Sequence, residues 1–128
     1  MSAPQFAGLD RESYISLATF RRDGRAVETP VWFARSGERL YVFSERAAGK
    51  VKRLRNSDRA RVAACNVRGG VHGDWIDARG RVVAESDTER RAYAALHAKY
   101  GWQMKVVDFF STLTGRIHGR AILEIDPA

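Results

Sequence analysis

The sequence predicts a mainly β fold, a small barrel of short antiparallel strands with helices packed outside it. Two observations support this prediction. Runs of β-branched and aromatic residues recur along the 128-residue chain, separated by glycine-containing turns, and helical spacing of apolar residues appears in only two clear stretches. There is no internal repeat, low-complexity tract or flexible linker. We therefore expect residues 1–128 to form one domain.

The first part of the chain predicts three strands joined by short turns. The strands should cover residues 14–20, 26–34 and 39–44. Asp23 and Gly24 form a hairpin turn signal, which needs a positive φ at Gly24, and Ser36-Gly37 marks a second turn. Three consecutive strands connected in this way are expected to form an antiparallel meander.

A change of period follows the third predicted strand. From residue 46 to 56, Ala47, Val51 and Leu54 fall at helical spacing, and basic residues stand between them. This pattern predicts a short basic helix that begins directly after a strand ending at Ser44.

The second half of the chain predicts three more strands. Residues 60–66 and 74–85 have strand character, with Gly80 at a bulge or bend in the second of them. Residues 119–125 resemble a closing strand, since Pro127 follows directly. With the first three strands, these would complete a barrel.

A longer helix should separate the last two of these strands. Ser86 and Glu89 match a capping box, and Gly101 provides the stop signal. Residues 102–118 fit either a helix or a packed loop. The buried face of the longer helix should carry Tyr93, Leu96 and Tyr100.

Composition excludes several classes of protein. Hydrophobic residues make up 45% and charged residues 29%, which argues against a disordered chain. No apolar run approaches the roughly 20 residues needed to span a bilayer, and we expect no signal peptide. Cys65 is the only cysteine, so no internal disulfide is possible, and we expect a cytoplasmic protein. Because Cys65 lies within a predicted strand, we expect it to be a small buried hydrophobic side chain. The net charge of +7 favours an anionic partner, which the sign alone leaves open among nucleic acid, lipid headgroup and phosphorylated small molecule.

The stretch around Ser44 predicts a phosphate site. A helix N-terminus offers unpaired N–H groups and partial positive charge. Lys50 and Arg53 lie on one side of the predicted helix, and their ammonium and guanidinium groups suit a phosphate ester. The alternative is a solvated basic face, and the residues alone leave both interpretations open.

A second candidate element is Thr29-Pro30-Val31-Trp32. Because proline cannot donate to a strand ladder, this segment should lie at a sheet edge or bulge with one side of its backbone free. A flat heteroaromatic ring could stack there and accept backbone hydrogen bonds. An edge strand that is simply protected from aggregation by its proline explains the pattern equally well.

Taken together, these motifs resemble the pyridoxamine 5′-phosphate oxidase-like flavin-binding split β-barrel proteins. The similarity is greatest to the small single-domain branch of deazaflavin (coenzyme F420)-dependent oxidoreductases, and it extends from about Tyr14 to Ile125. The motifs are, in order, YISLATFRRDG at 14–24, TPVWF at 29–33, LYVF at 40–43, GKVKRLR at 49–55, NVRG at 66–69 and KYG at 99–101. Members that oxidise pyridoxamine phosphate carry a longer chain and a substrate-phosphate signature that is not found here, which argues against that activity.

The resemblance implies a six-stranded antiparallel split β-barrel of the FMN-binding type. It also implies a homodimer with a flavin-type cofactor, FMN or F420, at the subunit interface. In similar proteins a hydroxyl at the end of the third strand and a lysine in the next helix hold the cofactor phosphate. Here these residues would be Ser44 and Lys50, assisted by Arg53.

The resemblance also suggests which residues meet the cofactor ring. The backbone from Thr29 through Pro30 and Val31 to Trp32 would line it, and Trp75 in the segment Gly73-Asp74-Trp75 would close the site. No catalytic side chain is identified.

The function implied is an oxidoreductase that transfers a hydride between the cofactor and a small electron-poor organic substrate. Two alternatives remain open, a small barrel that binds single-stranded nucleic acid and a flavin or haem carrier without turnover. His72, His97 and His118 lie far apart without paired spacing, so no metal site is expected.

Overall fold

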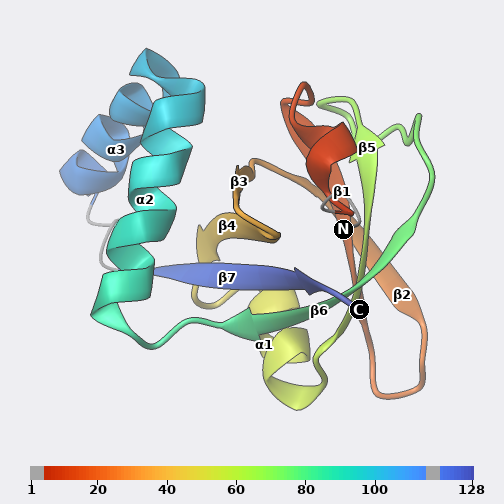
Figure 1. The fold of residues 1–128 in the computed structure, drawn as a ribbon. Helices are drawn as coiled ribbons and strands as arrows, with labels where there is room; N and C mark the ends of the chain where they lie inside the picture. Colours follow the sequence, from red (N-terminus) through yellow and green to blue (C-terminus); the bar gives the residue numbers. More distant parts are fainter. Residues whose placement is uncertain (1–4, 115–118) are drawn as a thin grey trace.

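A curled antiparallel sheet forms the centre of the computed structural model, which describes residues 5–114 and 119–128 (Figure 1). Within these ranges the sheet has seven strands in the order β2-β1-β5-β6-β7-β4-β3. The strands are β1 Tyr14–Phe20, β2 Ala26–Val31, β3 Ala34–Ser36, β4 Arg39–Glu45, β5 Arg59–Cys65, β6 Ile76–Val82 and β7 Arg120–Pro127. The helices are η1 Ala7–Leu9, α1 Gly49–Asn56, α2 Ser86–Tyr100 and α3 Trp102–Thr114. The mainly β, split-barrel fold predicted from the sequence is confirmed.

The strand count differs from the six that were expected, because the predicted strand at residues 26–34 is interrupted at Trp32 and Phe33. The backbone N–H of Phe33 donates to the hydroxyl oxygen of Tyr100 at 2.9 Å rather than to a neighbouring strand. The same hydroxyl lies 2.8 Å from the carbonyl oxygen of Ser13. A side chain 67 residues along the chain therefore takes the place of a ladder partner and divides β2 from β3.

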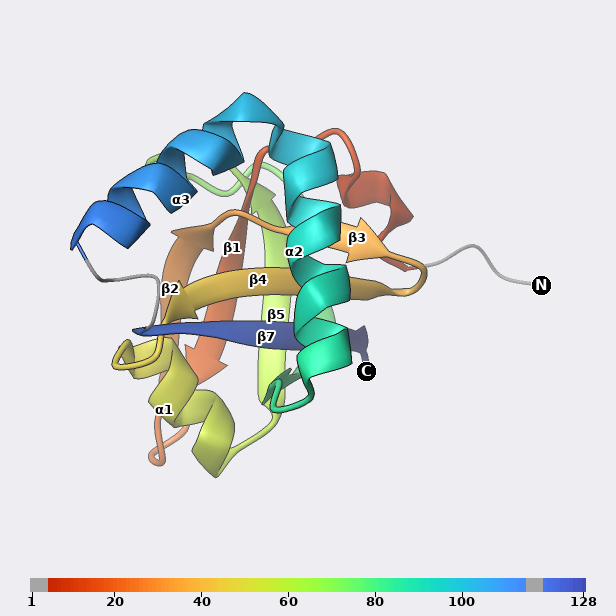
Figure 2. The same ribbon diagram turned by 90° about the vertical axis from the view of Figure 1, so that its left-hand side faces the viewer.

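The expected three-strand meander is wrong. β1 and β2 form one hairpin, and β3 and β4 form another, but β2 and β3 stand at opposite edges of the sheet. Only Trp32 and Phe33 separate the two strands, so the curl of the sheet must bring its two edges close together, and Figure 2 shows the chain running from β2 into β3. β4 therefore pairs with the last strand, β7, which closes the sheet with a long-range contact that local sequence patterns do not reveal.

The two predicted turn glycines have the expected backbone conformation, but the bulge predicted at Gly80 does not form. Gly24 has a φ of +88° and Gly37 has a φ of +63°, as their turns require. Gly80, however, is not at a bulge, because it pairs with Ile125 in the regular β6–β7 register. A Cβ at this position would lie 3.0 Å from side-chain atoms of Leu54 and Ile125. Glycine is needed there because α1 packs directly onto β6.

The two predicted helices form, with altered starts. α1 begins at Gly49 rather than at residue 46. α2 begins at Ser86 itself, with Glu85 as N-cap and no side-chain cap hydrogen bond, so the capping-box prediction is wrong. The carboxylate of Glu85 instead accepts hydrogen bonds from Nη1 of Arg81, at 3.1 Å to each of its oxygens. The predicted end of α2 is confirmed, since Gly101 has a φ of +57°.

The segment after Gly101, for which the sequence left a helix and a packed loop open, begins with a helix. α3 covers Trp102–Thr114, and residues 115–118 of the ambiguous stretch lie outside the described residues. No helix in the described part of the chain is long and apolar enough to cross a membrane.

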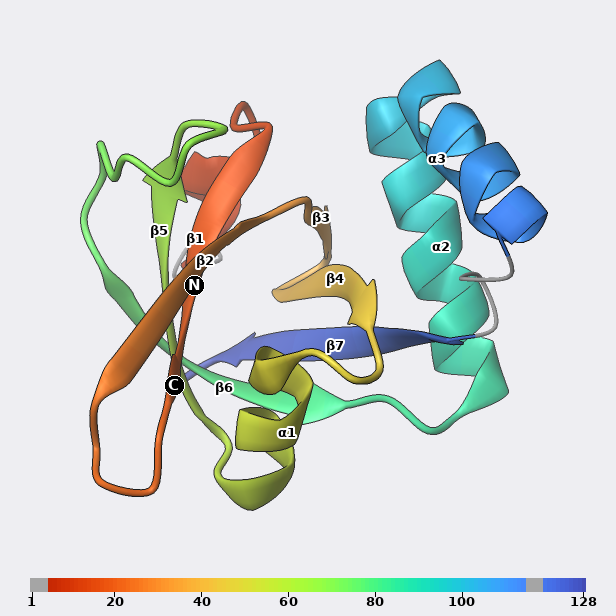
Figure 3. The same cartoon turned by 180° about the vertical axis from the view of Figure 1, so that it is seen from behind.

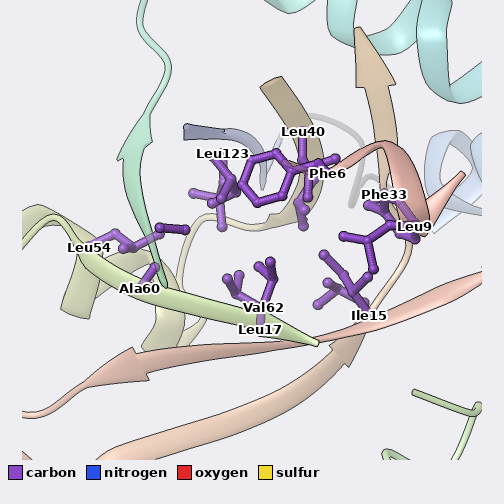
Figure 4. Packing of buried hydrophobic residues seen from close by; sticks show 14 of the residues in the cluster. Phe6, Leu9, Ile15, Leu17, Phe33, Leu40, Leu54, Ala60, Val62 and Leu123 are labelled. Atoms are coloured by element: carbon purple, nitrogen blue, oxygen red, sulfur yellow. The ribbon is translucent and has the colours of Figure 1, made fainter. Parts of the chain in front are cut away.

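Two apolar clusters hold the elements together. The larger one fills the interior of the curled sheet, and Figure 4 shows its side chains converging from the strands, from α1 and from the N-terminal segment. The smaller one joins α2 and Met104 of α3 to the outer side of β4 and β7. Burial of these side chains is the main favourable term in the stability of the fold. The interior cluster includes Phe6, Leu17, Phe33, Leu40, Val62 and Leu123.

Candidate functional site

The end of β4 and the start of α1 carry the predicted phosphate-binding residues. Ser44 is 6% exposed, and its hydroxyl donates to the carbonyl oxygen of Glu45 at 3.2 Å. The helix does not follow directly, because residues 46–48 form a connection in which the N–H of Ala48 bonds to Glu45 O at 3.0 Å. Figure 3 shows α1 below the end of β4. The strand end and the helix start thus remain neighbours despite the longer connection.

Lys50 is half-buried, and Glu45 is the one carboxylate whose charge is seen to act on it in the described ranges. Lys50 forms no hydrogen bond or ion pair with another residue in the described ranges. Burial lowers the pKa of its ammonium group, and the charge of Arg53 lowers it further, while Glu45 partly offsets both effects. A half-buried cation that forms no ion pair is less favourable than one in water. An anion bound at this point would relieve that cost.

Arg53 is held in place by its neighbours. Its Nε donates to the hydroxyl of Thr19 at 2.7 Å, and its guanidinium lies so close to Gly49 that a Cβ there would be 2.7 Å from Nη1. Burial and the charge of Arg21 lower the pKa of Arg53. The remaining N–H groups of this guanidinium are available to a ligand, since no carboxylate in the described part of the chain pairs with it.

The segment Thr29 to Val31 lies in an edge strand, as the proline predicts. β2 pairs only with β1 among the described strands, so the other side of its backbone has no ladder partner. Thr29 donates its hydroxyl to the carbonyl of Leu17 at 3.5 Å. Pro30 is exposed, and Val31 is buried in the barrel interior.

The basic helix contacts β1, the strand that pairs with this edge strand. Arg53 contacts Thr19, and Thr19 pairs across the strands with Val27, two residues before Thr29. Within one chain, β1 therefore links the Lys50–Arg53 pair to β2.

The side chain of Trp32 is already committed to packing. Its ring stacks on Tyr100 with centroids 4.4 Å apart and an interplanar angle of 8°. It also meets the Phe43 ring edge-on at 6.2 Å. Only the backbone of this residue is thus a candidate for ring contact.

Trp75 lies away from Ser44 within one chain. It precedes β6, whose Ala78 pairs with Pro127 of β7, whereas Ser44 pairs with Ala121 at the opposite end of β7. At about 3.4 Å per residue, this separation is roughly 20 Å. The indole instead lies under the guanidinium of Arg61 at 5.6 Å. A role for Trp75 in the site stays a prediction that would require a second chain.

Sequence reasoning missed Arg21 and Arg22. Both line the same pocket as Arg53, between the β1–β2 hairpin and α1. The signal was present in the run Arg21-Arg22-Asp23-Gly24-Arg25, whose basic residues flank the predicted turn.

The histidines are engaged elsewhere. His72 Nε2 lies 2.6 Å from a Glu12 carboxylate oxygen, and His97 Nε2 lies 2.8 Å from Asp108. His118 is outside the described residues. Within the described ranges, no group of three or more His, Cys, Asp or Glu side chains is placed to hold a metal ion. Cys65 is buried as predicted, and burial raises the pKa of its thiol.

Comparison with known families identifies one match. A family model described as pyridoxamine 5′-phosphate oxidase matches residues 4–128 of the chain. No curated protein matches the sequence.

Solved structures with the same fold include proteins of differing description. An F420 reductase is 19% identical, with a TM-score of 0.63, and the alignment covers 100% of this chain and 96% of the other. A FAD-binding protein from Mesorhizobium loti is 16% identical, with a TM-score of 0.64 and coverage of 100% and 91%. HutZ, the heme storage protein from Vibrio cholerae, is 14% identical, with a TM-score of 0.72 and coverage of 98% and 89%. At these identities the likeness shows the fold alone.

Proposed function

Because the chain belongs to the pyridoxamine 5′-phosphate oxidase family, we propose that it binds a flavin-type cofactor, FMN or the deazaflavin F420. The proposed activity is hydride transfer between that cofactor and a small electron-poor organic substrate. We further propose a cytoplasmic homodimer with the cofactor at the subunit interface. The observation that carries the proposal is the half-buried ammonium group of Lys50, which forms no ion pair within the described ranges and lies on α1, the helix that follows the strand containing the buried Ser44.

The groups around Lys50 fit a cofactor phosphate. Lys50 supplies a point charge, Arg53 a planar guanidinium whose Nε is fixed by Thr19, and Ser44 a hydroxyl. Backbone N–H groups at the start of α1 add to this positive potential. A phosphate here would provide the charge compensation that both cations lack.

The chain's own role in the reaction is to bind and orient. By the β1–β2 register, the backbone groups of Thr29 and Val31 face β1, whereas the N–H and C=O of Glu28 and the C=O of Pro30 face the unpaired side of β2. These outward groups could bond the edge of a planar ring, and Pro30 supplies no donor. The packed barrel interior behind Val31 excludes water from that side of the site. The bound cofactor supplies the hydride chemistry itself.

Lys50→Ala tests the phosphate assignment. Removing a charge-assisted contact should weaken FMN or F420 binding by about 1.5–3 kcal/mol, roughly 10- to 150-fold in affinity. Quenching of cofactor fluorescence measures the affinity. Lys105→Ala, which removes an exposed lysine from α3, is the matched control and should bind as wild type does. Equal affinities for all three proteins would remove Lys50 from the site.

The alternatives separate by turnover and by ligand. A carrier would bind the cofactor yet reduce no member of a panel of quinones and unsaturated ketones. A haem carrier would bind haem, and since Nε2 of His72 and of His97 is bonded to a carboxylate, either imidazole would have to use Nδ1 as the iron ligand.

A further inference from the structure

A strongly basic pocket of about 530 Å³ lies between α1 and the β1–β2 hairpin. Basic side chains from three elements line it, and no Asp or Glu does. Phe20 forms an aromatic part of its wall. The basic residues are Arg21, Arg22, Lys52, Arg53 and Arg59.

The charge of this pocket is uncompensated. None of its five basic side chains forms an ion pair with any residue that the structure describes. The two carboxylates nearest in sequence are already engaged. Asp23 is 2.8 Å from Arg25, and Asp58 is 3.6 Å from Arg79. The excess positive charge therefore faces the pocket and solvent.

Two of the cations are held in defined positions. Thr19 fixes Arg53 through its Nε, and the guanidinium of Arg59 stacks over the Phe20 ring at 3.9 Å. The charge of Arg21 also acts on Arg53, as the lowered pKa of Arg53 indicates. Ordering two guanidinium groups beforehand reduces the entropy lost when an anion binds.

We propose that this pocket binds an anion carrying two or more adjacent negative groups, of the oligophosphate class. A single phosphate contacts two or three donors, whereas five cations around one pocket match a longer anion. Such an anion has two sources, a free oligophosphate or the anionic tail of a cofactor. Arg53 also belongs to the proposed cofactor site, so binding of a cofactor tail in this pocket rests on the proposed function. Binding of a free oligophosphate does not.

Calorimetric titration with sodium tripolyphosphate tests the proposal on the full chain. At low ionic strength tripolyphosphate should bind at least about tenfold more tightly than orthophosphate. The double variant R21Q/R22Q should lose about tenfold in tripolyphosphate affinity, because it removes two exposed charges of the pocket. R25Q is the matched control, since Arg25 lies on the same hairpin but is paired with Asp23 and does not line the pocket. It should change the affinity less than about twofold.

Three results would overturn the inference. One is equal affinity for tripolyphosphate and orthophosphate, and another is an equal loss in R25Q and R21Q/R22Q. The third is a generic 12-nucleotide single strand that binds more than about tenfold more tightly than tripolyphosphate, which would assign the surface to nucleic acid instead.

Titration of tripolyphosphate into FMN-loaded protein distinguishes the two sources. Displacement of FMN indicates that the pocket continues the cofactor site, and simultaneous binding indicates a separate ligand. Binding of tripolyphosphate by a protein that binds neither FMN nor F420 would leave the inference standing while the proposed function fails. The reverse pattern would reject the inference alone.

Discussion

Lys99 places an ammonium group against an aromatic ring. Its Nζ lies 3.3 Å from the centroid of Phe33, and it is half-buried between α2 and the N-terminal segment. The nearby carboxylate of Asp10 is already bound by Arg35, at 2.6 and 2.7 Å. Burial lowers the pKa of Lys99 to about 8, with Asp10 and Glu12 partly offsetting it.

This lowered pKa predicts a pH-dependent stability. Below about pH 8 Lys99 is charged in both the folded and unfolded chains, so the cost of burying its charge is fully present. Between about 8 and the ordinary value of 10.5, the unfolded chain binds more protons than the folded one, and the folded state gains stability as pH rises. Lys99→Met should therefore unfold at higher urea concentration than wild type at pH 7, with the difference shrinking toward pH 10.5.

Urea unfolding at a series of pH values measures this difference. Lys105→Met serves as the control, because Lys105 is exposed. The difference in urea midpoint between Lys105→Met and wild type should therefore be the same at every pH. A constant gap between Lys99→Met and wild type across the pH range would contradict the assignment.

At the scale of elements, the contact between α1 and β6 depends on Gly80. Gly80→Ala would place a methyl group 3.0 Å from Leu54 and Ile125, in a packed interior. We expect a loss of about 1–3 kcal/mol in the free energy of unfolding, since the side chains of Leu54 and Ile125 must move away from the new methyl group within a packed interior. Gly119→Ala is the control, because a Cβ there meets nothing within 4 Å. Urea unfolding of both variants checks the prediction, and equal midpoints would show that α1 adapts without cost.

Local patterns predicted the elements well but not their partners. The strand Tyr14–Phe20 matches its prediction residue for residue, because a run of β-branched and aromatic residues and the Gly24 turn are local signals. The break at Phe33 depends on Tyr100, which no local window contains. Pro30 does lie in an edge strand, as its missing N–H predicts. The predicted meander of three strands is wrong, because strand pairing also depends on contacts between residues far apart in the sequence.

For the candidate site, too, local spacing predicted neighbours within one element but not contacts between elements. Lys50 and Arg53 share a helix, so their spacing alone placed them together. Arg21 joins the same basic region only through the fold, when the hairpin packs beside α1. Trp75 was assigned by resemblance to a segment that the sheet register then places at the other end of β7.

At the scale of the whole molecule, positive charge is unevenly compensated. Many arginines form ion pairs within the described ranges, whereas the basic residues of α1 and its flanking turns form none. The paired ones are Arg25, Arg35, Arg39, Arg61, Arg79, Arg81, Arg90 and Arg120. The unpaired ones around α1 are Arg21, Arg22, Lys50, Lys52, Arg53, Arg55 and Arg59. Part of the net charge of +7 is thus concentrated beside the candidate site.

This concentration predicts that cofactor binding depends on salt through the phosphate. Raising the ionic strength from about 0.01 M to about 0.15 M shortens the Debye length from about 30 Å to about 8 Å, so charges beyond the first contacts stop contributing. FMN affinity should fall about three- to tenfold over this range. Riboflavin has the same ring without the phosphate and should change less than about twofold, because its uncharged tail does not sense the field of α1. Fluorescence titrations of both ligands at the two salt concentrations measure the contrast, and a parallel response would mean that the ring, not the anionic tail, meets the cationic surface.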